Sequence, residues 1–136
     1  MSANRQRPIE DLSQCSCRGN HLDKLIQPMI LTVLSHSALH GYKIVNAIAE
    51  KPIFQGRRPD STGVYRTLRT MEKRCLISSD WDISDIGPAK KVYRLTKTGA
   101  RCLMHWTETL ERYRDNIQSI LEEAQNACKS ERSHKG

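Results

Sequence analysis

The sequence contains no long apolar segment. None of its 136 residues belongs to a run of about 18 consecutive apolar residues, the length that a membrane-spanning helix requires. Residues 1–11 are polar and lack the apolar core of a secretory signal peptide. We therefore expect a cytoplasmic protein that has no membrane partner.

Apolar residues are scarce overall. They make up 38% of the chain, which is a small share for a chain that would bury all of itself. A chain of 136 residues has room for one compact domain with appendages. We expect parts of it to be extended, disordered, or buried only against a second copy.

The motifs of common enzyme classes are also missing. There is no glycine-rich phosphate-binding loop, no H-E-x-x-H motif and no nucleophile elbow. Three acidic residues, Asp80, Asp82 and Asp85, lie close together, and we interpret them as the solvated end of a hairpin. We expect that the protein is not an enzyme and needs no cofactor.

Cysteine does not occur in the pattern of a secreted protein. The five cysteines are odd in number and irregularly spaced, which argues against a disulfide framework. We expect reduced thiols at Cys15, Cys17, Cys75, Cys102 and Cys128.

Positive charge is in excess. The formal net charge is +7, and the isoelectric point is near 9.4. Clustered Lys and Arg gain free energy when they release counterions from phosphates, so the charge favours a polyanionic partner such as double-stranded DNA.

The spacing of apolar residues predicts three short helices. Apolar positions three and four residues apart over 22–34 predict the first helix, which Pro28 either begins or kinks. A second helix over 44–49 should stop before Pro52, and the segment 51–60 reads as a loop. Asp60, followed by Ser61 and Thr62, can cap a third helix that continues to residue 73.

The pattern then changes to that of strands. Residues 76–83 and 91–95 are rich in β-branched and aromatic residues, and a glycine and a proline lie between them. They predict a hairpin. Three helices followed by a hairpin indicate a winged helix-turn-helix, a mainly α fold with a small β-hairpin.

A long helix should follow. Residues 98–128 contain no proline and no glycine beyond Gly99, and seven apolar residues recur alternately every three and four positions. Such a helix is longer than the small domain can cover, so the simplest partner for its apolar seam is a second copy of the chain. The predicted dimerisation residues are Leu103, Trp106, Leu110, Tyr113, Ile117, Ile120 and Ala124.

These elements divide the chain into four parts. Residues 1–21 form a flexible, cysteine-bearing arm, and residues 22–97 form the winged helix. Residues 98–128 form the dimerisation helix, and residues 129–136 form a disordered polar tail.

Basic residues collect on the third helix and on the hairpin. In a winged helix the N-terminal half of the third helix enters the major groove of DNA, and the hairpin lies over the flanking backbone. The candidate DNA-binding residues are therefore Ser61, Thr62, Tyr65, Arg66, Arg69, Lys90 and Lys91. These features together favour a DNA-binding function over a set of merely solvated charges.

The sequence also resembles the PadR-like family of transcriptional regulators over residues 22–101. The matching residues are Leu39-His40-Gly41-Tyr42, Gly63-Val64-Tyr65 with Leu68, Met71-Glu72, Leu76-Ile77, Gly87-Pro88-Ala89-Lys90-Lys91-Val92-Tyr93-Arg94-Leu95-Thr96 and Gly99. The resemblance implies a homodimeric winged-helix repressor that binds a palindromic operator and, in many members, is released by an inducer. Family members commonly have proline where this chain has Arg66.

Three inputs and one rival function stay open at this point. A small molecule could bind between paired long helices, where Trp106 and its seam neighbours would supply stacking surface. A metal or redox signal could act at Cys15, Cys17, Cys102 and His105, because Cys and His three apart on a helix can reach one ion. The regulator could also have no ligand, and a winged helix can serve as a protein-interaction module instead.

Overall fold

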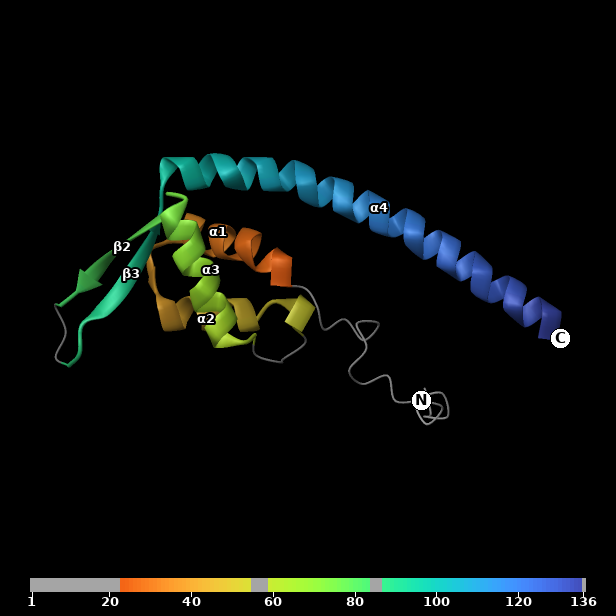
Figure 1. Ribbon diagram of the computed structural model, residues 1–136, viewed down its shortest axis with the longest axis horizontal. Coiled ribbons are helices and arrows are strands. Elements are labelled where there is room, and N and C mark those ends of the chain that lie inside the picture. Colours follow the sequence, from red (N-terminus) through yellow and green to blue (C-terminus); the bar gives the residue numbers. More distant parts are fainter. Residues whose placement is uncertain (1–22, 55–58, 84–86, 136) are drawn as a thin grey trace, which may run out of the picture.

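The computed structural model describes residues 23–54, 59–83 and 87–135 of the protein. Three short helices and a small sheet form a compact body, and one long helix extends from it (Figure 1). In chain order the elements are the short 3-10 helix η3 (Asp23–Leu25), α1 (Ile26–His36), β1 (Leu39–His40), α2 (Gly41–Ala49), the 3-10 helix η4 (Pro52–Phe54), α3 (Ser61–Lys73), β2 (Ile77–Asp82), β3 (Lys90–Leu95) and α4 (Lys97–Lys135). This arrangement confirms the predicted mainly helical winged-helix fold with a long C-terminal helix.

The core lies between the three short helices and the sheet. Side chains of α1, α2, α3 and β2 are fully buried there: Ile30, Leu31, Ile44, Ile48, Val64, Leu68, Met71 and Ile77. Burying an aliphatic side chain of this size contributes about 1.5–3 kcal/mol, so this cluster sets the angle at which α3 lies on the body. Cys102 of α4 packs against the same cluster.

The first helix begins between the two starts that the sequence allowed, which were residue 22 with a kink at Pro28, or Pro28 itself. Regular helix starts at Ile26, so Pro28 lies in the first turn, where a missing backbone N–H costs little. The carbonyl of Pro28 accepts a hydrogen bond of 2.8 Å from Thr32 Oγ1.

The third helix has the predicted limits. Asp60 is its N-cap, and Asp60 Oδ1 accepts a hydrogen bond from the backbone N–H of Thr62 at 3.2 Å. The helix ends at Lys73, and Cys75 then adopts a left-handed backbone conformation (φ 61°) that turns the chain into β2. Leu76 and Ile77 follow directly in the core.

The sheet has one strand more than the predicted hairpin. Its order is β1-β3-β2, and both pairs are antiparallel. Leu39 and His40 form an additional strand that the sequence did not predict, and they pair with Tyr93 and Val92 of β3. The second helix follows directly at Gly41, three residues before its predicted start at residue 44.

Alternation along the hairpin gives it two different faces. Trp81 pairs with Lys91 and Ser79 with Tyr93, and these four side chains share the face toward α3, where Ser79 Oγ donates to Glu72 Oε2 at 2.6 Å. On the opposite face Asp82 pairs with Lys90, and the other residues there are Ser78, Asp80, Val92 and Arg94.

The long helix α4 has 39 residues and would span about 58 Å at the rise of an α-helix. Only its first turns contact the body. Leu103 and Trp106 pack against the core cluster, and Trp106 Nε1 donates to Gln27 Oε1 of α1 at 2.8 Å. Two residues of the predicted dimer seam are thus partly covered by their own chain.

The prediction of a disordered C-terminal tail is wrong. Residues 129–135, which we expected to be disordered, continue α4 as far as Lys135. They are mostly Lys, Glu, Arg and Ser without proline or glycine, so nothing in them stops a helix.

No helix among residues 23–54, 59–83 and 87–135 has the length and apolar character needed to cross a membrane.

Gly99 fixes the junction between the body and α4. A Cβ at this position would overlap the carbonyl oxygen of Leu76, and the backbone N–H of Gly99 donates to Thr96 Oγ1 at 2.9 Å. We expect Gly99→Ala to lower the free energy of unfolding by about 1–3 kcal/mol, as overpacking does, measured by chemical denaturation. Gly63→Ala is the matched control, because a Cβ there meets Asp60 at an ordinary 3.6 Å. Equal stability of the two variants would contradict the role of Gly99.

Candidate nucleic-acid interface

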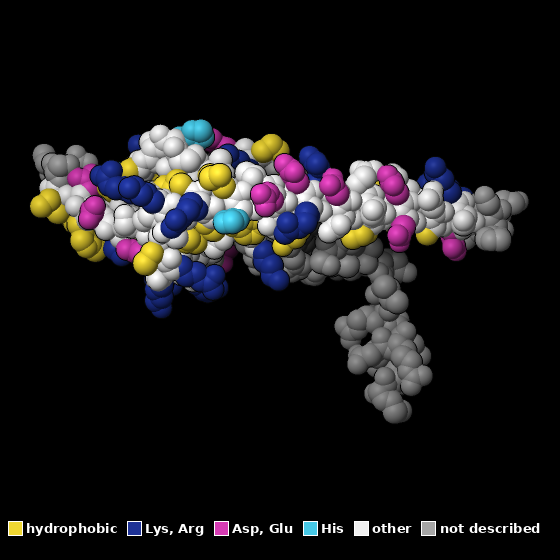
Figure 2. All heavy atoms as spheres, turned by 90° about the horizontal axis from the view of Figure 1, so that it is seen from above, with side chains coloured by type: hydrophobic (Ala, Val, Ile, Leu, Met, Phe, Trp, Pro, Cys, Tyr) yellow, Lys and Arg dark blue, Asp and Glu magenta, His cyan; other side chains and the backbone are white. Residues whose placement is uncertain are grey.

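The exposed side of α3 carries the predicted contact residues. Val64, Leu68 and Met71 face the core, and the opposite side presents Ser61, Thr62, Arg66 and Arg69 as exposed side chains with Tyr65 half-buried. Figure 2 shows the Lys and Arg side chains gathered over the compact half of the molecule and projecting from one of its edges. Along the part of α4 that extends beyond the compact half, acidic and basic side chains are intermixed.

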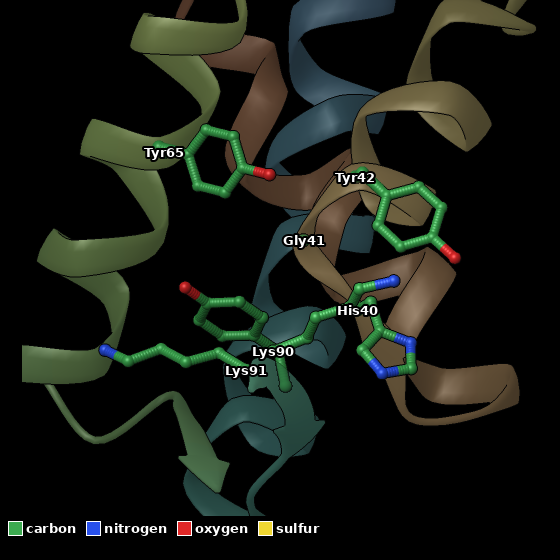
Figure 3. A pocket seen from close by; sticks show the side chains of 7 residues that line it. His40, Gly41, Tyr42, Tyr65, Lys90 and Lys91 are labelled. Carbon is green, nitrogen blue, oxygen red and sulfur yellow. The ribbon is translucent and has the colours of Figure 1, made fainter. Parts of the chain in front are cut away.

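A pocket of about 280 Å³ lies between α3, the start of α2 and the wing, the hairpin of β2 and β3 (Figure 3). Its lining consists of His40, Gly41, Tyr42, Tyr65, Lys90, Lys91 and Tyr93. The structure thus brings three predicted residues, Tyr65, Lys90 and Lys91, to one cavity. The side chains of Tyr65 and Lys91 approach the cavity from α3 and β3, on opposite sides (Figure 3).

Tyr93 is a member of this pocket that the sequence did not single out as functional. Its side chain is 5% exposed. Burial raises the pKa of the Tyr93 hydroxyl above its usual value, and the nearby Glu72 raises it further. A raised pKa favours the neutral hydroxyl, which can donate a hydrogen bond.

Gly41 allows α2 to approach Tyr65. A Cβ on Gly41 would lie 2.6 Å from Tyr65 Cε1 and 2.9 Å from the Tyr65 hydroxyl oxygen. Gly41 has no left-handed backbone conformation, so glycine is needed here for space. The position of the Tyr65 ring in the pocket depends on that missing side chain.

The carboxylates of β2 are held on the face away from α3. His40 Nε2 lies 3.1 Å from Asp82 Oδ2, and Arg94 Nε lies 3.9 Å from Asp80 Oδ2. The ring of Tyr42 stacks on His40 with centroids 5.8 Å apart. Lys90 Nζ lies 5.3 Å from the centroid of the Tyr42 ring.

These contacts leave the positive charge next to α3 uncompensated. Within the described part of the chain Arg66, Arg69 and Lys91 form no ion pair with a carboxylate. Chemically, the guanidinium groups on the exposed side of α3 can bind phosphate oxygens, and so can the pocket that Tyr65, Tyr93, Lys90 and Lys91 line.

Of the candidate thiol and metal residues, the structure describes Cys102 and His105. Cys15 and Cys17 lie outside the described residues. Cys102 packs against the core, whereas His105 three positions later is exposed. No group of three or more possible metal ligands occurs among the residues that the structure describes.

Beyond Trp106 the seam of α4 is exposed. Its members there are Leu110, Tyr113, Ile117, Ile120 and Ala124. Leu121, which the seam did not include, is also exposed beside them and widens the apolar strip.

Comparisons with known proteins agree with this geometry. Residues 30–105 match the profile of the transcriptional regulator PadR-like family. No curated protein sequence matches the chain. A candidate transcriptional regulator from Thermoplasma acidophilum is similar in structure, with a TM-score of 0.65 and 27% identity over 74% of this chain and 94% of that one.

Two further solved structures have the same fold. A PadR-family regulator from Clostridium difficile superposes with a TM-score of 0.61 and 22% identity over 71% of this chain and 98% of that one. PadR of Bacillus subtilis, solved in complex with operator DNA, superposes with a TM-score of 0.54 and 24% identity over 61% of this chain and 47% of that one. Because the profile covers more than half of the chain, the chain belongs to the PadR-like family of transcriptional regulators.

Proposed function

We propose that this transcriptional regulator is a homodimeric repressor that binds a palindromic operator. The observation that carries the proposal is the exposed side of α3, where Arg66 and Arg69 form no ion pair with a described residue, and where Tyr65 shares a pocket with the lysines of the wing. Such a surface fits the negative charge of a DNA duplex. The Bacillus subtilis relative with operator DNA supports the same use of the fold.

In this proposal α3 enters the major groove. Ser61 and Thr62 lie at its N-terminus, and Arg66 and Arg69 follow on its exposed side, where a guanidinium can bind guanine in a bidentate manner. The pocket beside Tyr65 then receives one backbone phosphate, to which Tyr65 and Tyr93 donate hydrogen bonds and Lys91 brings charge.

A second copy of the chain completes the regulator. The exposed strip of α4 from Leu110 onward is apolar over several turns, and a helix–helix interface would bury it. Two-fold symmetry would place two α3 helices on successive turns of DNA, which matches a palindromic site.

Release of the repressor by an inducer is the further part of the proposal. We place the ligand between the paired α4 helices, at Trp106 with Leu110 and Tyr113. The indole N–H of Trp106 already bonds Gln27, so the ligand would contact its ring. A thiol or metal response through Cys15, Cys17 and Cys102 is the alternative input. It predicts bound metal, or an operator affinity that changes with reductant.

Selection of bound duplexes from random DNA tests the function directly. We expect a palindromic consensus and an affinity that falls as salt rises, with a slope of log affinity against log salt of about −0.9 per phosphate contact. Recovery of no consensus, together with binding that does not depend on salt, would favour a protein-interaction module instead.

Gly41→Ala should weaken the selected complex without unfolding the protein. The added Cβ pushes the Tyr65 ring from its place, and the phosphate loses the Tyr65 hydrogen bond. We expect a loss of about tenfold in affinity, the value of one hydrogen bond to a charged group. Fluorescence anisotropy with the labelled duplex measures it. Tyr65→Phe should show a similar loss, and full affinity in both variants would exclude Tyr65 as a contact.

A further inference from the structure

Two large apolar side chains at the wing are exposed and do not pack in the core. Trp81 of β2 is 63% exposed, and Ile83 just beyond the strand is 79% exposed. Neither belongs to the core cluster nor to the residues packed against it. A tryptophan this exposed adds little buried apolar surface to the folded monomer, so its place on the wing points to a binding partner.

The orientation of Trp81 limits what that partner can be. Trp81 shares its face of the hairpin with Lys91 and with the buried Tyr93, which is the face toward α3. The two aspartates of β2 point to the opposite face and are paired there with His40 and Arg94. The cross-strand pairs on the Trp81 face therefore include a lysine and no carboxylate. Glu72 of α3 approaches this face at Ser79, whose hydroxyl donates a hydrogen bond to it.

Lys91 connects the indole of Trp81 with the candidate DNA-binding surface. Its ammonium lies 5.6 Å from the centroid of the Trp81 ring, within the range of a cation–π contact. The same Lys91 lines the pocket beside Tyr65. The indole thus continues the surface that begins on α3, and a molecule lying along α3 and the pocket would reach Trp81 next.

We propose that Trp81 is a DNA-contact residue whose indole packs against the sugar wall of the minor groove beside the half-site. This inference depends on the DNA-binding function proposed above. The walls of the minor groove are apolar deoxyribose edges bordered by phosphates, and apolar side chains are used by many proteins to enter this groove. An indole with an ammonium at its face matches both chemical features, because the ring meets the sugars and Lys91 meets the phosphate.

Removal of the indole should weaken DNA binding without a change in charge. For Trp81→Ala we expect about a tenfold loss of affinity for the duplex recovered by selection, because the complex loses the burial of a large apolar side chain. The salt slope should stay unchanged, because no phosphate contact is lost. Trp81→Phe should recover part of the affinity. Ser78→Ala, on the opposite face of the same strand, is the matched control and should bind like the wild type.

The tryptophan fluorescence of the protein makes the contact visible. The chain has two tryptophans, Trp81 and Trp106. In a Trp106→Phe variant all tryptophan emission comes from Trp81, and we expect the duplex to shift this emission and to protect it from acrylamide. In a Trp81→Phe variant the duplex should not protect the remaining emission from acrylamide, because Trp106 lies on α4 against Gln27 of α1 and not on the wing.

Base substitution in the duplex identifies the groove. An inosine·cytosine pair resembles A·T in the minor groove and G·C in the major groove. When A·T pairs flanking the half-site are replaced by G·C and then by inosine·cytosine, a minor-groove contact predicts loss of affinity with the first and recovery with the second. Trp81→Ala should be insensitive to both changes.

The outcomes separate this inference from the function on which it rests. If no duplex is recovered by selection, both fail. If the wild type binds a selected duplex but Trp81→Ala binds equally well and the Trp81 emission is unaffected, only the contact assigned to Trp81 is overturned. A Trp81 emission that depends on protein concentration in the absence of DNA, with a changed oligomeric state in Trp81→Ala, would show instead that the wing docks on a second copy.

Discussion

An Ile117→Asp variant is expected to be a monomer and to lose at least 100-fold in affinity for an operator with two half-sites. The side chain of Ile117 is 62% exposed in the single chain, so Asp costs little there. In a dimer the same position lies in the apolar strip, where an unpaired buried charge costs about 3–5 kcal/mol. The symmetry of a dimer applies this cost twice.

Analytical ultracentrifugation and light scattering measure the oligomeric state, and anisotropy with full and half operators measures binding. Ser119→Asp is the matched control: it adds the same charge two residues away on the exposed helix, off the three- and four-residue spacing of the seam. This variant should remain dimeric. A monomeric wild type, or an Ile117→Asp variant that stays dimeric, would contradict the proposed interface.

The seam of α4 shows which structural features the spacing of apolar residues can predict and which it cannot. Regular spacing identifies which side of a helix is apolar, and the structure confirms a continuous long helix with that side. Spacing does not say what covers each residue. Leu103 and Trp106 satisfy the same repeat as Ile117, yet they pack against the core of their own chain because the first turns of α4 lie over α1.

Local sequence was sufficient for α3. An Asp-Ser-Thr start, an apolar stripe and a proline-containing loop before it are all local signals, and the helix begins and ends where they predict. The strand β1 has no comparable signal, because its two residues are extended only through pairing with Val92 and Tyr93, more than fifty positions later. The prediction for the end of α4 was wrong for a different reason. The polarity of residues 129–135 suggested disorder, although most of these residues are good helix formers.

The candidate site was predictable only in part. Charge and helix position identified Tyr65, Arg66 and the wing lysines as a group. The pocket that joins Tyr65 to Lys91 also needs Tyr93 from the sheet and the bare backbone of Gly41. Both depend on contacts between elements, and a glycine next to a tyrosine in a sequence does not reveal which distant ring it makes room for.

The combined variant Arg66→Ala/Arg69→Ala should lose at least about 30-fold in affinity for the selected duplex, since each arginine contact with DNA is worth about 1–3 kcal/mol. Both side chains are exposed, and neither forms an ion pair with a described residue, so the free energy of unfolding should change by less than about 0.5 kcal/mol. A variant that lost both DNA binding and stability would point to a structural role for these residues. Lys24→Ala/Arg101→Ala removes the same charge from exposed positions outside α3 and the wing, and it should bind DNA almost normally.

Replacement of the same two arginines by lysine separates charge from geometry. Lysine keeps the positive charge but cannot form the bidentate pair that a guanidinium forms with guanine or phosphate. If Arg66 and Arg69 serve only as phosphate contacts, Arg66→Lys/Arg69→Lys should retain most of the affinity, and its salt slope should match that of the wild type. If one of them reads a base, the lysine variant should lose discrimination at one position of each half-site when selection is repeated. An alanine variant with wild-type affinity would remove α3 from the interface altogether.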